Sequence, residues 1–552
     1  MKRSWRFLAW TLFLGAVAFG GLFGDQLLAV GDDETDEQIR LYTEMLQIAH
    51  DSYGTDVEYR DLVYASIRGM LRFLDPHTSF LSPEDYDSMR SRQQSSFYGL
   101  GILVSMRNGQ LTVISPIEGT PAWRLGLRAG DVINSIEGEP TDTMSLDEAV
   151  NKLKGPKGTE VGISIVRRGL TEPLPLNVTR AEIPQNTVRY AYMIAPQTGY
   201  IRLTDFSRST AGEMTEAIDD LESQGMERLV LDLRSNGGGL LDQVIEVAHR
   251  FVPPDTKIVE TRGRTRDSDQ SFFAEDGRPL DKPLVVLVNN GTASAAEILA
   301  GAVQDHDVGL VVGTPTWGKG LVQTVYNLSY GAGIALTTAK YYTPSGRLIQ
   351  RDYSSYFDYY THFGGEDEDE QLEVSVDEPA FDTDLGRTVY GGGGITPDVE
   401  VDLPQLPEIL QFLYARNAFF DFAVDFTRQN TIDSATWQPP ADLLDRFGSW
   451  LLEEELVEPE EIEGKLQDET VSAYASRQIH ADILNATFGT EASHRVLAAG
   501  DTQIQRALEL FDEAEQLLAS RQTMGTDVRT PALSTEPPAG ATGESVPDGS
   551  LP

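Results

Sequence analysis

The amino-acid sequence predicts an α+β fold with several domains, and three observations lead to this prediction. The chain has 552 residues, enough for three or four domains, and 40% of them are hydrophobic. Between residues 181 and 403, apolar strand-like runs alternate with helix-like stretches, which is typical of a layered α/β core. Residues 97–180 instead carry short alternating strands and glycine turns, and residues 404–521 read as amphipathic helices.

The N-terminus has the pattern of an export signal. Basic residues at positions 2, 3 and 6 precede an apolar run at 7–23, and small residues at 29–31 offer a cleavage site. The apolar run is also nearly long enough to span a bilayer, which needs about 20 residues. Residues 1–31 are therefore either a signal peptide or an uncleaved membrane anchor. Both alternatives predict a periplasmic or extracytoplasmic location, and the second adds anchoring to the inner membrane.

Residues 32–96 follow as a predicted helical segment. Apolar residues recur there at helical spacing, first in 39–48 and again in 62–73. Pro76 and Pro83 then interrupt this pattern, so the segment should end in turns before the next domain begins.

Composition limits both the chemistry and the partners. The 44 basic and 86 acidic residues give a net charge of −42, which disfavours binding to nucleic acid or anionic lipid through bulk charge. The sequence has no cysteine, which excludes disulfides, a lipidated N-terminal cysteine and a cysteine nucleophile. It also lacks an H-E-x-x-H motif, so we expect no metal ion and no other cofactor.

Two residues of the core carry the candidate chemistry. Ser294 lies in N-N-G-T-A-S-A-A-E, where a strand-like run turns into a helix-like stretch, so its hydroxyl should lie near unpaired helix N–H groups. Such a hydroxyl becomes a nucleophile if a base can reach it. Lys319, in W-G-K-G-L-V-Q, can be that base if burial lowers its pKa from about 10.4. Taken singly, the serine would be read as a helix N-cap and the G-K-G as a turn, so the hypothesis depends on the pair.

Together these motifs resemble the catalytic core of the carboxy-terminal processing proteases, the tail-specific peptidases of S41 type. In that family the lysine follows the serine by 25 positions, as it does here. The resemblance runs from about residue 40 to residue 402 and implies a crotonase-like α/β protease core with an inserted PDZ domain. Further segments that resemble the family are Leu74–Glu84, Asp232–Gly239, Tyr341–Gln350 and Gly394–Val401.

The resemblance and the chemistry assign a role to each core residue. Ser294 attacks a peptide carbonyl to form an acyl-enzyme, a neutral Lys319 takes the serine proton, and Gln323 orients the lysine. The two N–H donors of the oxyanion hole are predicted at Ala295 and, in the glycine loop, at Gly238.

Two other residues are candidates for a role at this site. His306 is the rival base, but it lies about one helix length from Ser294 at ~1.5 Å per residue, so a serine–histidine mechanism is the weaker alternative. Glu297 reads as an acid in the first turn of a helix and is kept outside the dyad.

Residues 97–180 carry the PDZ pattern, including its helix-turn-strand element at Pro121–Gly138. A peptide should add as a strand beside the first strand of this domain, with its terminal carboxylate held by loop N–H groups. The predicted peptide-binding residues are Gly99, Leu100, Gly101, Ile102, Leu103 and Val104. The predicted function is an exported serine endopeptidase that recognises the C-terminal tails of proteins. The alternative is a PDZ scaffold or chaperone-like binding protein with an inactive protease core.

The remaining segments have no assigned chemistry. Residues 351–392 form an insertion in the core, and we expect its acidic run, 366–370, in a solvated loop, with a role near the active site left open. The helical extension, 404–521, must bury its clustered phenylalanines against the core, a second copy of the chain or an adaptor protein, and a homo-oligomer is the preferred alternative. The clustered phenylalanines are Phe419, Phe420, Phe422 and Phe426.

Residues 522–552 are rich in Pro, Gly, Ser and Thr and are expected to be disordered.

Overall fold

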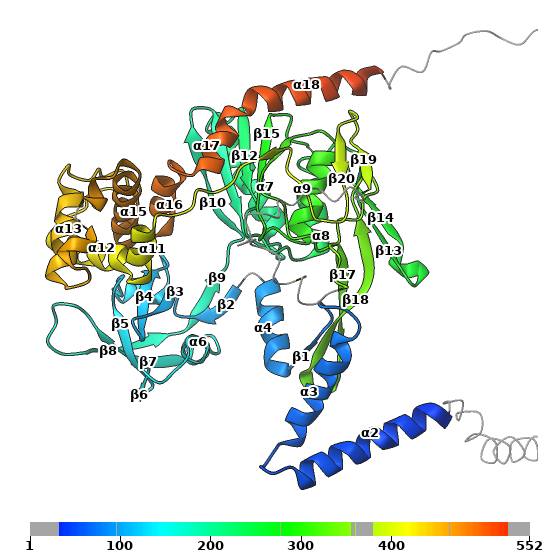
Figure 1. Ribbon diagram of the computed structural model, residues 1–552, viewed down its shortest axis with the longest axis horizontal. Helices are drawn as coiled ribbons and strands as arrows, with labels where there is room; N and C mark the ends of the chain where they lie inside the picture. The colour runs from blue at the N-terminus through cyan, green and yellow to red at the C-terminus, as the bar shows by residue number, and fades with distance from the viewer. Residues whose placement is uncertain are drawn as a thin grey trace, which may run out of the picture. The chain divides into compact units, whose positions relative to one another are not determined.

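A computed structural model of the protein describes residues 33–94, 96–275, 278–354, 359, 379–462 and 464–527. The chain divides into two compact units, the first made of residues 1–86 and 323–337, the second of residues 87–322 and 338–552. The predicted N-terminal segment 1–31 and the acidic run 366–370 lie outside the described residues. Figure 1 shows the order of the helices and strands along the chain.

The first unit combines helices with a short antiparallel strand pair. α2 (Asp33–Ser52) and α3 (Tyr59–Arg72) confirm the helical reading of this segment. β1 (Ser79–Leu81) pairs with Gly333–Ala335, the first residues of β18 (Gly333–Tyr342). A small core forms where Leu71, Phe80 and Ala332 are buried together.

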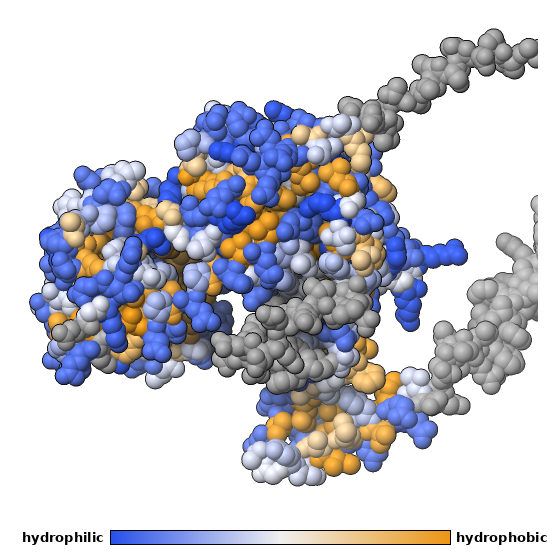
Figure 2. All heavy atoms as spheres, turned by 45° about the horizontal axis from the view of Figure 1, so that its top comes forward, coloured by the Kyte–Doolittle hydropathy of each residue, from blue (hydrophilic) through white to orange (hydrophobic). Residues whose placement is uncertain are grey.

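The helices of the first unit expose many apolar side chains, which Figure 2 shows in orange. Phe73 is 91% exposed, and Leu41 and Met70 are each about 60% exposed. An exposed apolar surface of this kind marks an interaction site more often than it marks a free surface.

The predicted PDZ domain lies in the second unit and is built on one sheet. In the described residues its strand order is β3-β4-β5-β7-β8, with β6 paired to β5, so β3 is an edge strand. Its helix α6 begins with a capping box formed by Ser145 and Glu148. β2 and β9 pair where the chain enters and leaves this sheet. The elements are β2 (Ser96–Gly99), β3 (Ile102–Arg107), β4 (Gln110–Pro116), α5 (Pro121–Arg124), β5 (Val132–Ile136), β6 (Glu139–Pro140), α6 (Leu146–Leu153), β7 (Glu160–Val166), β8 (Leu174–Thr179) and β9 (Ala181–Pro184).

The predicted protease core is built on a second sheet, ordered β10-β11-β12-β15-β16-β21 in the described part of the chain. β11, β12, β15, β16 and β21 run parallel, and β10 joins the edge antiparallel to β11. The residues of β11, β12, β15 and β16 are nearly all buried, as expected for parallel strands covered on both faces, whereas most residues of the edge strands β10 and β21 are half-buried or exposed. The strands are β10 (Val188–Ala195), β11 (Thr198–Leu203), β12 (Arg228–Asp232), β15 (Leu284–Val288), β16 (Leu310–Gly313) and β21 (Val399–Glu400).

Helices cover both faces of this sheet (Figure 1). On one face α7 (Thr210–Ser223), α8 (Leu241–Ala248) and α9 (Ala295–Asp305) pack against side chains such as Leu231 and Val286. On the other face the last two helices pack against Val230 and Leu287. These are α17 (Thr502–Glu509) and α18 (Phe511–Asp527). The prediction of an α+β multidomain chain with a layered α/β core is therefore confirmed.

Two hairpin-like additions complete the core. β13 (Lys257–Gly263) pairs with β14 (Gln270–Phe273) and with the end of β18 at Ala339–Tyr342. Within the predicted insertion 351–392, residues 380–390 form a second hairpin, so part of this segment is regular structure rather than a loop. Its strands are β19 (Ala380–Asp382) and β20 (Thr388–Tyr390).

The helical extension packs on its own chain. α12 places Phe419, Phe422 and Phe426 in a core shared with Phe447 of α13 and with α15. All four clustered phenylalanines are at least 94% buried, so the expectation that they form a self-association surface is wrong. The amphipathic pattern was read correctly, but the covering surface lies within the chain. The helices are α11 (Glu408–Ala415), α12 (Ala418–Gln429), α13 (Leu443–Glu453), α14 (Pro459–Ile462), α15 (Glu469–Phe488) and α16 (Thr490–Ala498).

The extension also contacts the PDZ domain directly. The Arg107 guanidinium donates to Asn417 Oδ1 at 2.9 Å and lies 4.0 Å from the centre of the Phe420 ring. Arg168 forms an ion pair with Asp425 at 2.6 Å. α12 therefore lies against the PDZ domain near the C-terminal ends of β3 and β7.

Two expectations about the chain ends are corrected. The predicted location included possible anchoring to the inner membrane, and this anchoring is contradicted, because none of the helices among the described residues is long and apolar enough to cross a bilayer. α18 continues to Asp527, so the first residues of the segment 522–552, expected to be disordered, are helical. Residues 528–552 lie outside the described residues.

Candidate active site

Ser294 lies at the junction between β15 and α9, as its motif predicts. It immediately precedes the first residue of α9 and has φ 56° and ψ −117°, a conformation that residues other than glycine rarely adopt. Such backbone strain persists only where surrounding contacts enforce it, and it clusters at functional sites. The half-buried side chain is thus presented at the N-terminal end of the helix, where developing negative charge is favoured.

Glu297 is the contact that enforces this geometry. Its buried carboxylate accepts hydrogen bonds from the backbone N–H of Ser294 at 2.7 Å and of Lys319 at 2.9 Å, both at Oε2. Its other oxygen accepts from the Gly318 N–H at 2.7 Å and the Thr316 hydroxyl at 2.5 Å. Burial raises the pKa of Glu297, although these four donors oppose that rise. One carboxylate therefore ties the serine loop to the lysine loop.

Tyr341 forms a second tie between the same two residues. Its hydroxyl lies 3.0 Å from the Ser294 carbonyl oxygen and 2.6 Å from the Lys319 carbonyl oxygen. Burial holds the pKa of Tyr341 well above its usual range, so the hydroxyl keeps the proton that it shares between the two acceptors. The backbones of Ser294 and Lys319 are thus held together through their N–H groups on one side and their carbonyls on the other.

Sequence reasoning missed both ties. Glu297 was read as a helix acid only, although its place three residues after Ser294 is the capping-box position, which is a signal for contact with the N-cap backbone. Tyr341 belongs to a segment recognised by resemblance, but no local pattern indicates that its hydroxyl reaches residues 47 positions earlier.

The glycine loop lies directly beside the serine. A Cβ atom on Gly238 would be 2.7 Å from Ser294 Cβ and 2.8 Å from Ala295 N, which only a residue without a side chain can avoid. The Gly238 N–H donates to Asn236 Oδ1 at 2.9 Å, so in this conformation it is already satisfied. Asn236 is itself fixed, because it donates to the Leu203 carbonyl and its own carbonyl accepts from the Ala293 N–H.

Replacing Gly238 by alanine should therefore lower kcat by about 100-fold, because the added methyl must displace the Ser294 loop. Gly238 also has φ +97°, which alanine does not readily adopt. Gly237→Ala is the matched control, since a Cβ at Gly237 would meet no atom within 4 Å. Kinetics of peptide cleavage by the two variants check this, and equal activity would contradict the placement of the loop.

Gln323 lies in the first unit, in β17 (Leu321–Asn327), whereas Ser294 and Lys319 lie in the second. Its amide nitrogen donates to the His77 carbonyl at 2.7 Å. The turn that presents this carbonyl is held by Asp75, which accepts from the N–H groups of His77 and Thr78 and from the Thr78 hydroxyl. The L-D-P-H-T-S segment thus supports the residue predicted to orient the lysine.

The insertion contributes a side chain near the lysine motif. The Trp317 indole N–H donates to the Tyr359 hydroxyl at 3.1 Å, and the two rings pack edge to face. Tyr359 is fully buried, and Trp317 precedes Lys319 by two residues. This contact places Tyr359 of the insertion beside the lysine motif, and a role of this segment in the reaction stays a prediction.

His306, the rival base, is engaged at the far end of α9. Its Nδ1 lies 2.8 Å from Asp384 Oδ2 and its Nε2 lies 2.7 Å from the Lys257 carbonyl oxygen. Both ring nitrogens are therefore occupied at the C-terminal end of the helix that Ser294 begins. This arrangement gives His306 a structural role.

The predicted docking edge of the PDZ domain is β3 and the loop before it. Leu100 is buried, and Gly101 has φ +79°, with the position of a Cβ filled by Thr120. The Gly101 carbonyl accepts from the Ile117 N–H at 2.9 Å, so the loop that would receive a carboxylate is held in place. Ile102 and Val104 pack against the core of the domain.

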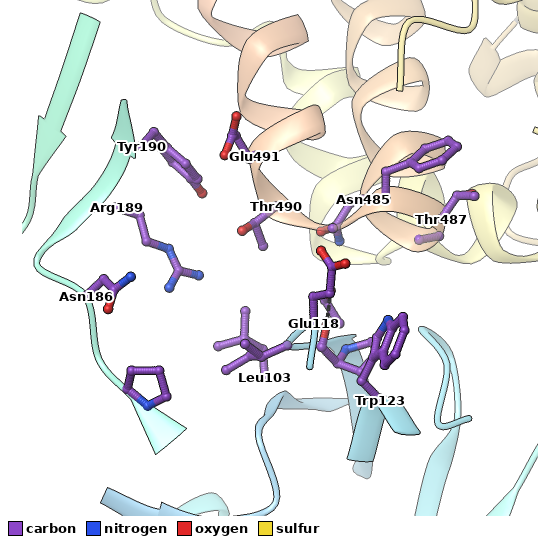
Figure 3. Close-up of a pocket in the computed structure, with 17 residues that line it drawn as sticks. Leu103, Glu118, Trp123, Asn186, Arg189, Tyr190, Asn485, Thr487, Thr490 and Glu491 are labelled. Carbon is purple, nitrogen blue, oxygen red and sulfur yellow. Dashed lines mark hydrogen bonds between the residues drawn. The ribbon is translucent and has the colours of Figure 1, made fainter. Parts of the chain in front are cut away.

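A cavity of about 480 Å³ lies next to Leu103 of β3 and is bordered by the PDZ domain, β10 and the turn between α15 and α16. Figure 3 shows Leu103 and Trp123 facing it from the PDZ domain and Arg189 facing it from the core. Since side chains alternate along a strand, Leu103 points into the cavity while its neighbours point into the domain. The cavity contains no residue of the serine or lysine motif, so it is separate from the candidate catalytic site.

Comparison with known proteins shows the family of the chain. Residues 197–354 match the model of peptidase family S41, and residues 112–167 match that of the PDZ domain. The carboxy-terminal-processing protease of Bartonella bacilliformis is 40% identical over 324 residues, 58% of this chain and 74% of that protein. The carboxyl-terminal-processing protease of Synechocystis sp. is 37% identical over 376 residues, 63% of this chain and 86% of that protein. Among solved structures, the photosystem II D1 C-terminal processing protease is 31% identical and covers 66% of this chain and 88% of its own, with a TM-score of 0.34. The chain therefore belongs to peptidase family S41, among the carboxy-terminal processing proteases, and carries a PDZ domain.

Proposed function

We propose that this protein is a serine endopeptidase that cleaves substrates near their C-termini, with Ser294 as nucleophile and Lys319 as general base. One observation carries the proposal: Glu297 and Tyr341 hold the backbones of these two residues together from both sides.

In the proposed reaction the Ser294 hydroxyl attacks the substrate carbonyl while Lys319 Nζ takes its proton. The C–N bond then breaks, Lys319 returns the proton to the leaving amine, and water hydrolyses the acyl-enzyme by the same route. The oxyanion is bound by the Ala295 N–H, at the start of α9, and by the Gly238 N–H. For Gly238 this requires the loop to turn its N–H from Asn236 Oδ1 toward the substrate. Gln323 orients the lysine, as the family motif implies.

Substrate tails are proposed to dock on the PDZ domain through residues 99–104. An extended peptide adds to the open edge of β3. Its terminal carboxylate accepts hydrogen bonds from the N–H groups of the Gly99–Gly101 loop. The rigid support of that loop by Thr120, whose hydroxyl donates to the Gly101 carbonyl at 3.1 Å, favours this role.

Two peptides that differ only in a free or amidated C-terminus test the function and the docking together. The purified protein should cleave both, and amidation should lower kcat/KM about tenfold, because it removes a charge-assisted hydrogen bond. Mass spectrometry of the products checks this. Binding without any cleavage would overturn the peptidase proposal, whereas equal cleavage of both peptides would overturn only the carboxylate recognition.

An adaptor protein and a homo-oligomer remain predictions. The buried extension phenylalanines no longer support self-association, but the exposed apolar side chains of α2 and α3 do. We therefore assign any contact between copies of the chain to these helices.

A further inference from the structure

The helical extension reaches the glycine loop through one arginine. Arg234, in the D-L-R-S-N-G-G-G segment, is 93% buried and precedes Gly238 by four residues. Its Nη1 donates to Asp501 Oδ2 at 2.8 Å and to Gln503 Oε1 at 2.9 Å. Both acceptors belong to the extension, which the S41 model match at residues 197–354 does not include.

The rest of the Arg234 guanidinium is held by the core. Its Nη2 donates to Asp232 Oδ2 at 2.7 Å, and Arg202 donates to the same oxygen at 2.6 Å. Arg202 also donates to the Arg234 carbonyl at 2.8 Å, which fixes the backbone where the loop begins. Burial alone would raise the pKa of Asp232, but the charge and hydrogen bonds of Arg234 override it and lower the pKa to about 2.

The two extension residues are themselves held in place. Asp501 is the N-cap of α17, and its Oδ1 accepts from the Ile504 N–H at 3.0 Å while its Oδ2 faces Arg234. Gln503 is 99% buried, and its Nε2 donates to the Val401 carbonyl at 2.7 Å. Asp501 thus binds the start of α17 through Oδ1 and Arg234 through Oδ2. Gln503 binds the Val401 carbonyl through Nε2 and Arg234 through Oε1.

The charges of this cluster balance only with the extension present. Arg202 and Arg234 face Asp232 and Asp501, two cations against two anions. Without Asp501 the buried Arg234 would keep a single shared carboxylate, and an imperfectly paired buried charge favours a rearranged loop.

We propose that Asp501 and Gln503 are positioning residues for the peptidase reaction: by holding Arg234 they set the glycine loop beside Ser294. This inference rests on the proposed function, because the loop matters only if Gly238 and Ala295 bind the oxyanion. These two residues of the extension would then influence the reaction at a distance, through the start of the loop.

Point substitutions test this better than truncation, since removing α17 and α18 would uncover the apolar sheet face around Val230 and Leu287. Asp501→Asn removes the charge but retains a good helix N-cap. Gln503→Met removes the acceptor at similar volume. Glu491→Gln is the matched control, because Glu491 is an extension carboxylate whose ion pair with Arg495, at 2.8 Å, is exposed.

With a peptide substrate, Asp501→Asn should lower kcat about tenfold while KM changes less than twofold, because the loop acts on the transition state rather than on substrate binding. Gln503→Met should give a smaller loss of the same kind, and the double variant should lose less than the product of the two, since both act on one guanidinium. Glu491→Gln should be unchanged. Thermal unfolding is followed for every variant.

Three results would overturn the inference while leaving the peptidase proposal intact. The first is an unchanged kcat in both Asp501→Asn and Gln503→Met. The second is a change in KM with no change in kcat, and the third is a loss of kcat that Glu491→Gln shares. If Asp501→Asn does not fold, Gln503→Met decides by the same criteria. A wild-type protein without activity would instead refute the proposed function on which the inference rests.

Discussion

Replacing Ser294 by alanine, or Lys319 by methionine, should each lower kcat/KM for a peptide substrate by on the order of 10⁴-fold or more. Alanine removes the atom that attacks, and methionine removes the amine while retaining the apolar stem. The Glu297 carboxylate and the Tyr341 hydroxyl bind backbone atoms of these residues, so both ties can still form in the two variants. Both variants should therefore unfold at nearly the wild-type temperature.

Because the two side chains act as one unit, the double variant should be no less active than either single variant. Cleavage assays on the three variants check this. Wild-type activity in the Lys319→Met variant would show that another group is the base.

Glu297→Gln should lower kcat by about 100-fold and should lower stability as well. The carboxylate accepts from four donors, and an amide in its place turns an N–H₂ group toward two of them. Each buried donor left without an acceptor costs about 1–3 kcal/mol, so this variant should also unfold at a lower temperature. The loops carrying Ser294 and Lys319 would then separate.

Glu213→Gln is a matched control for Glu297→Gln. Glu213 also accepts from two backbone N–H groups, those of Thr187 and Val188, but it lies on α7 and contacts neither motif. Its replacement should lower stability without a comparable loss in kcat. If the two variants lose kcat equally, Glu297 has a general structural role and no specific one at the site.

The sequence alone was enough to predict the main architecture and the two motif loops. Buried parallel strands are recognisable as apolar runs, and Ser294 and Lys319 stand in short segments whose spacing is informative. Their strained or glycine-flanked backbones are local properties, which a local pattern can reveal.

Contacts between distant segments could not be predicted in this way. Tyr341 reaches Ser294 across 47 residues and Asp501 reaches Arg234 across 267 residues, and neither pair shares a local pattern. The phenylalanines of α12 indicated that an apolar face must be covered, but not what covers it. The expectation of a second copy of the chain was therefore wrong, because α13 and α15 supply the covering surface.

The most direct test of the Ser294/Lys319 assignment is to trap a covalent adduct on the nucleophile, either the acyl-enzyme from a peptide or the phosphonyl ester from a fluorophosphonate. The full chain is mixed with a free-acid peptide substrate or a fluorophosphonate, quenched in acid, and digested for mass spectrometry. The adduct should map to Ser294 in the wild type, be absent in Ser294→Ala, and form at a greatly reduced rate in Lys319→Met. An adduct on another residue, or one that forms as fast without Lys319 as with it, would contradict the account.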